Sequence, residues 1–309
     1  MKKLYAGLVL GCLLASSAQA KTYAEMFGQE PPYEGDAVKL LNSLDFKQGH
    51  IDLPDVPASL DVPDQLYYLD VRDTKTLLTE IWGNPPSAAE GVSGMLMPAK
   101  YPPEADIGWG TVISYEADGY VSDEDAEEID YNELLSSLKT AISENNPERE
   151  KAGYEPMELI GWASPPHYEK QEHALHWAKD LLFGKDKDGP HTLNYAVRVL
   201  GREGVLEMNF IAGLDQLDEI KTNIPSFLKV TNFDQGKKYT DFMEGDKVAG
   251  YGLAGLIAAG AGAKLAAKAG IFAIALAFLK KGFVIVLVAA AGAWRFVKGL
   301  FGKKDGPTG

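Results

Sequence analysis

The C-terminal end of the chain, residues 248–301, constrains the protein most, because it is far more apolar than the rest. Three runs within it carry no ionisable side chain: Val248–Ala263, Ala269–Leu279 and Gly282–Trp294. A helix needs about 20 apolar residues to cross ~30 Å of hydrocarbon, so each run must recruit a flanking lysine or join its neighbour. We expect residues 247–301 to form membrane-anchoring helices, followed by a basic tail at 302–309. Helices packed on the body or on another subunit are the alternative.

The charges of this segment leave one or two crossings open. Basic residues prefer the cytoplasmic side, so the group from Arg295 to Lys304 favours a single crossing. Four internal lysines favour instead a cytoplasmic loop between two spans: Lys264, Lys268, Lys280 and Lys281. Small residues at helical spacing, such as Ala254, Ala258 and Gly262, would let helices approach closely in lipid. The expected partners are therefore the lipid bilayer and either envelope proteins or a second copy of the chain.

Residues 1–20 have the pattern of a secretory signal peptide. Lys2 and Lys3 precede an apolar stretch, and Ala18-Gln19-Ala20 is a small-residue cleavage signal. A lipidation signal ending at Cys12 is a rival interpretation, but it leaves a short apolar region. Cys12 is the only cysteine, so cleavage after Ala20 leaves a mature chain without thiols. With the anchor, this predicts an exported main domain that is held on a membrane.

The exported body, residues 21–246, is strongly acidic. It holds 43 acidic and 19 basic residues, whereas the chain from Lys247 onward holds one acidic and nine basic residues. A body with this charge repels nucleic acid, so a nucleic-acid partner is not expected. A cofactor is not expected either. Gly250–Gly255 fits G-x-G-x-x-G but lacks the preceding strand and the later acidic residue of a dinucleotide site.

Strand and helix patterns in the body predict an α+β domain with an antiparallel sheet and packed helices. The clearest strand signal is the alternation of apolar and polar residues in 193–199, followed by the turn 201–204 and a second alternating run to Phe210. Prolines separate short strands near 50–53, 58–62 and 65–69. Asp73 is the expected cap of one helix, and Asn146 before Pro147 the expected end of another.

Two groups of residues are candidate metal ligands. Asp123 and Asp125 belong to an acidic cluster that could bind a divalent cation, although a capping box formed by Ser122 and Asp125 at a helix start explains the same residues. Three histidines lie close together in the sequence: His167, His173 and His176. They could supply a zinc pair if a helix runs here, but the order H-E-x-x-H is missing and a strand hairpin fits equally well.

The polar face of the predicted hairpin is a further candidate. Its outward residues are Asn194, Arg198, Glu207 and Asn209. They would form either a solvated surface, which is the default for such sheets, or a polar patch for a ligand.

Several motifs resemble one family in their order and spacing. They are Trp82-Gly83-Asn84-Pro85-Pro86, Gly119-Tyr120-Val121-Ser122-Asp123, Leu193-Asn194-Tyr195, Leu200-Gly201-Arg202-Glu203-Gly204 and Asp246-Lys247-Val248-Ala249. They are similar to motifs of the bacterial membrane-anchored proteins called domain of unknown function 2167, over roughly Ala37 to Ala277. The resemblance implies a Gram-negative envelope setting and one continuous unit. With the signal peptide and the anchor, it predicts a bacterial inner-membrane protein whose main domain is periplasmic. It implies no activity and no site residues.

Two classes of function follow. The first is a non-enzymatic envelope protein whose acidic periplasmic domain binds a partner or stabilises a membrane complex. The second is a membrane-tethered hydrolase or metal-dependent enzyme, for which the sequence lacks G-x-S-x-G, a P-loop and H-E-x-x-H. Active sites can assemble from distant residues, so the five candidate ligands above are where such a site is expected.

Overall fold

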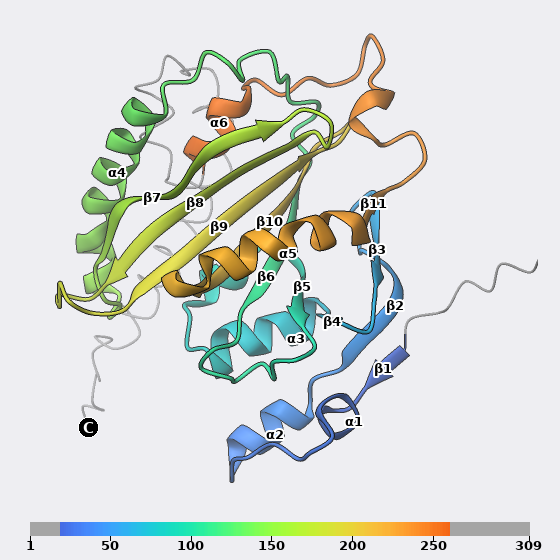
Figure 1. The fold of residues 1–309 in the computed structure, drawn as a ribbon, viewed down its shortest axis with the longest axis vertical. Coiled ribbons are helices and arrows are strands. Elements are labelled where there is room, and N and C mark those ends of the chain that lie inside the picture. Colours follow the sequence, from blue (N-terminus) through green and yellow to red (C-terminus); the bar gives the residue numbers. More distant parts are fainter. Residues whose placement is uncertain (1–18, 260–309) are drawn as a thin grey trace, which may run out of the picture. The chain divides into compact units, whose positions relative to one another are not determined.

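The computed structural model describes residues 19–259 and shows an α+β fold with a large antiparallel sheet (Figure 1). The described chain divides into two compact units. The first comprises residues 19–115, 208–212 and 216–238, and the second comprises residues 116–207, 213–215 and 239–259. Strand β10 (Val205–Gly213) contributes residues to both.

The first unit is a sheet of short strands with helices. In strand order it contains β11 (Thr231–Phe233), β3 (Ala58–Val62), β2 (Phe46–Asp52), β4 (Leu66–Leu69), β5 (Val92–Pro98) and β6 (Gly110–Glu116), and β1 (Gln19–Lys21) pairs with β2. The helices are α1 (Tyr23–Phe27), α2 (Asp36–Asn42), α3 (Val71–Thr76), the π-turn η1 (Leu77–Ile81), the 3-10 turn η2 (Pro86–Ala89) and α5 (Leu217–Val230). The proline-separated strands expected near 50–69 are confirmed.

One helix of the first unit starts earlier than expected. Asp70, not Asp73, caps α3, because its carboxylate accepts the backbone N–H of Asp73. Asp73 is buried and accepts bonds from the Asp45 N–H and from Arg72. Leu77 then lies in the core. The prediction of a helix here was right, and its assigned cap was wrong.

A polar cluster in the first unit joins α5 to the β5–β6 region. The carboxylate of Glu219 accepts hydrogen bonds from the Trp109 indole at 2.8 Å and from Lys100 at 2.9 Å. Trp109 is 1% exposed and packs its ring against Phe210 and Phe227. Burial opposes the charged form of Glu219, but these donors hold its pKa below the usual value.

The second unit is built on long antiparallel strands, which Figure 1 shows side by side. They are β7 (Met157–Glu169), β8 (Ala174–Phe183) and β9 (His191–Leu200), and β10 is the next neighbour of β9. The strand alternative for the histidine segment is therefore correct. Helix α4 (Tyr131–Lys151) lies along β7, and the short elements are η3 (Leu214–Gln216), η4 (Tyr239–Asp241) and α6 (Leu253–Ala259).

Helix α4 continues past the proline that was expected to end it. Its N-cap is Asp130, which accepts the N–H groups of Asn132 and Glu133, and Pro147 lies inside the helix. The Asn146 side chain bonds both the N–H and the C=O of Met157, at 2.8 and 2.9 Å. This tie to the start of β7 provides tertiary contacts for the turn in which proline removes a backbone donor.

Residues at the start of the apolar C-terminal sequence belong to the core of the second unit. In α6, Leu253, Leu256 and Ile257 are at most 4% exposed and pack in one cluster with Trp177 and Val121. Within residues 19–259, no helix is long and apolar enough to span a bilayer. The rest of the predicted anchor, from residue 260, and the predicted basic tail lie outside the described residues.

Most of the predicted signal peptide, residues 1–18, also lies outside the described residues. Strand β1 covers the predicted cleavage site, since Gln19 and Ala20 pair with Gln48 and Lys47. Cleavage after Ala20 would leave only Lys21 of this strand.

Candidate interaction site

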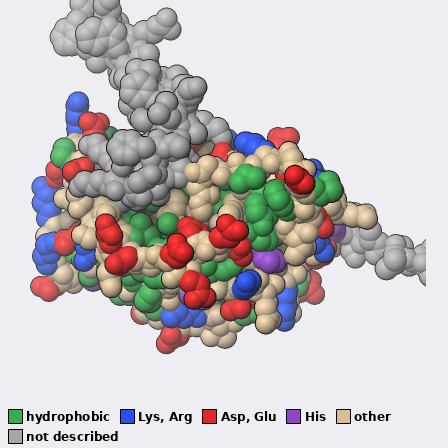
Figure 2. All heavy atoms as spheres, turned by 90° about the horizontal axis from the view of Figure 1, so that it is seen from above, with side chains coloured by type: hydrophobic (Ala, Val, Ile, Leu, Met, Phe, Trp, Pro, Cys, Tyr) green, Lys and Arg blue, Asp and Glu red, His purple; other side chains and the backbone are tan. Residues whose placement is uncertain are grey.

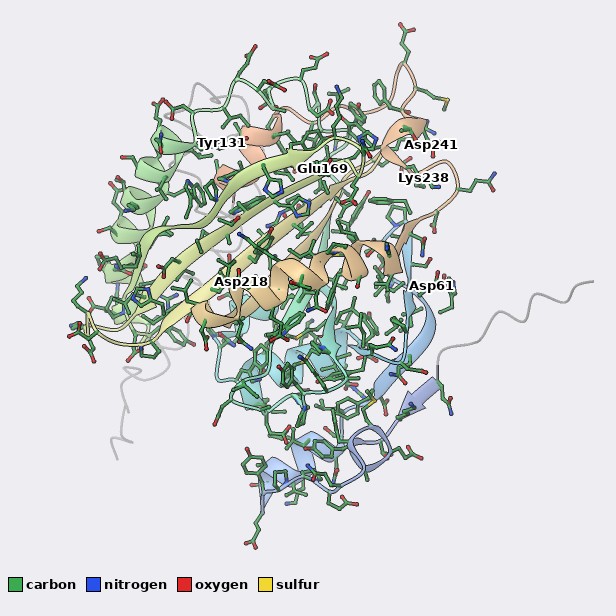
Figure 3. The ribbon with its side chains drawn as sticks, in the orientation of Figure 1. Asp61, Tyr131, Glu169, Asp218, Lys238 and Asp241 are labelled. Carbon is green, nitrogen blue, oxygen red and sulfur yellow. The ribbon has the colours of Figure 1, made fainter. Side chains whose placement is uncertain are left out.

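All five candidate ligands lie in the second unit, in or beside three segments that meet. The segments are residues 118–130, the turn joining β7 to β8 and residues 239–254, and together we call them the interaction site. Figure 3 labels Glu169 at the end of β7, Tyr131 at the start of α4 and Asp241 in η4, which mark these segments.

A hydrogen-bonded chain joins Asp123 to the β7–β8 turn. The Tyr168 hydroxyl donates to Asp123 Oδ2 at 2.9 Å and lies 3.3 Å from His173 Nδ1. His173 adopts a left-handed conformation with φ of 49°, and its carbonyl accepts the Leu200 N–H. Burial and the Asp123 carboxylate raise the Tyr168 pKa well above its ordinary value. Tyr168 is therefore a neutral donor that fixes Asp123 on the hairpin.

Stacked aromatic rings attach residues 239–249 to the same place. The Tyr239 ring lies 4.5 Å from that of Tyr120 and 4.5 Å from that of His173. Its hydroxyl donates to the Val121 carbonyl at 3.1 Å. Tyr120 also forms a parallel bridge with Val248. Aromatic pairs in such geometry stabilise a structure by more than the apolar area that they bury, so these rings help to hold residues 239–249 in place.

Asp125 connects the acidic cluster to the C-terminal sequence. Its two carboxylate oxygens accept the N–H groups of Leu253 and Ala254 at 2.9 and 3.2 Å, at the start of α6. A Cβ on Gly252 would lie 2.6 Å from an Asp125 oxygen, so a side chain at this position would displace the carboxylate. The capping box of Ser122 and Asp125 at the start of α4 is wrong, because Asp125 bonds a helix 128 residues away in sequence.

The structure brings two of the histidines together and places the third with Asp123. His167 and His176 pair across β7 and β8, with rings 5.0 Å apart and nearly parallel. His176 is 4% exposed, and burial, with a smaller contribution from His167, lowers its pKa to about 4. His176 is consequently neutral at physiological pH.

The candidate ligands have other contacts. Among residues 19–259, no group of three or more His, Cys, Asp or Glu side chains has a geometry suited to a metal ion. Asp123, Asp125 and His173 each contact another segment of the second unit, as described above. These contacts can hold the three segments of the interaction site together.

Sequence reasoning missed an exposed turn in this site. Asp246 closes it by accepting the Met243 N–H, and Arg202 binds the same carboxylate through two bonds of 2.8 Å. Met243 is 57% exposed and Val248 is 54% exposed. Only the preference of Gly245 for positive φ, here 98°, signals the turn in the sequence.

Acidic side chains are exposed beside these contacts. Glu124, Glu127 and Glu128 are exposed in the turn region before α4, and no side-chain bond forms from them within the described chain. On the face shown in Figure 2, acidic side chains are scattered among basic, neutral and hydrophobic ones. These three glutamates therefore offer exposed negative charge beside the interaction site.

Comparisons with known proteins give one family and one distant structure. The family model described as "Protein of unknown function (DUF2167)" matches residues 45–292. A search of curated proteins finds no match. The solution structure of cyanobacterial PsbP (CyanoP) from Synechocystis sp. PCC 6803 is similar at 13% identity, covering 59% of this chain and 89% of that one, with a TM-score of 0.32.

Proposed function

Because the chain belongs to the DUF2167 family, whose function is unknown, we propose a role from its own residues: a non-enzymatic, membrane-anchored envelope protein whose acidic body binds other proteins. In this proposal the signal peptide exports the body to the periplasm, and the apolar C-terminal sequence holds it on the bacterial inner membrane. The body then stabilises a membrane complex.

The observation that carries the proposal is the packing of α6. This helix opens the apolar sequence, yet its side chains lie in the core of the second unit and its first N–H groups bind Asp125. A body joined to its anchor by a flexible linker would make no such contacts. The connection supports a body held rigidly at the start of the anchor, as a structural member of a complex requires.

The acidic surface indicates the chemistry of the partner. The body carries a large excess of acidic residues, and several glutamates before α4 are exposed. Charged surfaces select oppositely charged partners and speed their encounter. The proposed partner is therefore an envelope protein with a basic surface, and salt should weaken its association.

Fractionation and protease protection of the full-length protein, tagged at the C-terminus, test the location. We expect the protein to pellet with inner membranes and to resist carbonate extraction, and protease added after permeabilising the outer membrane should digest the body. A protected tag would indicate one crossing, and a digested tag would indicate two. Recovery of the protein in the soluble fraction would refute the anchor.

Native electrophoresis of the detergent-solubilised protein tests the partner role. We expect a complex larger than the monomer that dissociates as salt is raised. Replacing Glu124, Glu127 and Glu128 with glutamine should weaken it, whereas replacing Glu30, Glu34 and Glu90 in the first unit is the charge-matched control. A monomer at all salt concentrations would contradict the proposal.

A further inference from the structure

Three polar side chains of the second unit share one face of the sheet, apart from the contacts described above. The β8–β9 register pairs Lys179 with Asn194 and Leu175 with Arg198. Alternate residues of a strand share a face, so Lys179, Asn194 and Arg198 lie on the same side. The sequence predicted this face to be polar and assigned it either to solvent or to a ligand. In the structure most of the face is core, since Trp177, Ala196 and Leu200 lie on it and are buried, whereas Lys179 and Asn194 are partly exposed.

Arg198 is not solvated. It is 5% exposed, its Nε lies 2.8 Å from a carboxylate oxygen of Glu207, and its guanidinium lies 5.0 Å from the Trp177 ring. Burial lowers the pKa of Arg198, and Glu207 and Glu116 oppose this by favouring its charged form. The positive charge of Arg198 is therefore offset by carboxylates in the same unit.

Lys179 has no such compensation. It is partly buried, and within residues 19–259 it forms neither an ion pair nor a hydrogen bond. Burial and the neighbouring positive charge of Arg198 lower its pKa to about 8. A partly buried ammonium beside a second cation is unfavourable, and proteins usually pair such a charge.

We propose that Lys179 and Asn194 form a binding site for a small oxyanion, a carboxylate or a phosphate group. The ammonium of Lys179 supplies the charge and the Asn194 amide supplies a neutral donor. Asn194 and Lys179 are both partly exposed, so a small group can reach them from solvent.

Thermal unfolding of the full-length protein in detergent tests this site. Phosphate and acetate are compared with chloride at equal ionic strength, in the wild type, in Lys179→Gln and in Lys185→Gln. Lys185 is a matched control because its side chain is 82% exposed in the turn between β8 and β9. We expect a saturable rise in Tm with one oxyanion in the wild type and in Lys185→Gln, and none in Lys179→Gln.

The two probes identify the source of the oxyanion, because a rise with phosphate alone indicates a phosphate ligand and a rise with acetate alone a carboxylate. No rise over chloride overturns the proposal and leaves Lys179 as a solvated lysine. An equal rise in Lys179→Gln also overturns it, since the anion then binds elsewhere.

Amine labelling of the wild type keeps the proposal testable if Lys179→Gln fails to fold. The full-length protein is treated with acetic anhydride at pH 8, and modification of each lysine is followed by mass spectrometry. At an anion concentration four times its Kd, Lys179 should react about fivefold more slowly, while Lys185 is unchanged. Equal rates at Lys179 in the oxyanion and in chloride would overturn the site.

Discussion

The two units differ in how they treat ionisable side chains. In the first unit, partners favour the charged form: the pKa values of Asp70 and Glu219 are lowered and those of Lys100 and His50 are raised, through bonds to oppositely charged groups. Burial opposes these shifts where it acts, but the bonds prevail. Charge in this unit therefore stabilises the fold.

In the second unit, three basic groups are shifted the other way, whereas the bond to Asp246 raises the pKa of Arg202 as such bonds do in the first unit. Burial lowers the pKa values of His176, Lys179 and Arg198, with smaller contributions from His167 to the shift of His176 and from Arg198 to the shift of Lys179. Buried basic side chains with lowered pKa values reduce the stability of the folded protein, because burial disfavours their charged forms. Shifts of this kind cluster at functional sites, so the comparison directs the search for function to the second unit.

The strongest challenge to this comparison is removal of the carboxylate that offsets Arg198. Glu207→Gln leaves a nearly buried guanidinium with a neutral partner, and we expect the free energy of unfolding to fall by about 3 kcal/mol. Chemical denaturation measures it. Glu158→Gln, which breaks an exposed pair with Lys187, is the control and should cost less than about 1 kcal/mol. Equal losses would mean that Arg198 is effectively solvated.

Acid should destabilise the second unit through His176. Its pKa is about 4 in the folded state and about 6.5 when unfolded, so the unfolded state binds more protons as pH falls from 6.5 toward 4. The contribution of neutral His176 to the free energy of unfolding is therefore fully present above pH 6.5, and about 2 kcal/mol of it should be lost at pH 5. His176→Phe, which keeps a ring beside His167, should flatten this part of the pH profile.

His50 in the first unit is the matched control for that profile. Its pKa is raised by hydrogen bonding to Asp61, with burial opposing, so its contribution is present below pH 6.5 and is lost as pH rises through the folded value. Figure 3 labels Asp61 on β3. His50→Phe should not remove the acid-induced loss, and a profile that it does flatten would contradict the role of His176.

A mutation in the first unit tests whether a charged side chain stabilises that unit. Glu219→Gln removes the charge that binds Lys100 while leaving an oxygen for the Trp109 indole. We expect a loss of about 1.5 kcal/mol in the free energy of unfolding, since bonds to charged groups are stronger than neutral ones. Denaturation with guanidinium, which screens exposed pairs, and with urea should both show it. A gain in stability would mean that this unit also carries a destabilising charge.

Much of the fold could be predicted from the sequence, because it rests on local patterns. The alternation in 193–199 and the prolines between short strands specify elements that residues nearby in the chain create. The predicted caps of α3 and α4 were wrong for different reasons. Asp70 and Asp73 are both good capping residues three positions apart, whereas Asp125 bonds a helix that is remote in sequence.

The candidate site was less predictable, because its contacts join distant segments. No spacing rule relates Asp123 to Tyr168, or Arg202 to Asp246. The burial of Arg198 depends on the packing of β8, β9 and the surrounding core, which periodicity cannot reveal. In the sequence, Arg198 alternates with apolar residues, which indicated that it lies on a polar outer face. Only the structure shows that Arg198 is buried.

The smallest effect separates two acceptors in the acidic cluster. Asp125→Ala removes the acceptor for two N–H groups of α6 and should cost about 1 kcal/mol, as the loss of a helix cap does. Ser122→Ala removes one bond of 3.3 Å to the Glu124 N–H and should cost less than about 0.5 kcal/mol.

Thermal unfolding of both variants with and without calcium completes this test. If Asp125 is a cap, calcium leaves the Tm of the wild type unchanged, and the loss in Asp125→Ala is the same in either buffer. A rise in the wild-type Tm that Asp125→Ala abolishes would instead show a cation at this carboxylate. In that case the second unit would bind ligands through an acidic side chain as well as through a basic one. The contrast with the first unit would then hold for acidic and for basic side chains.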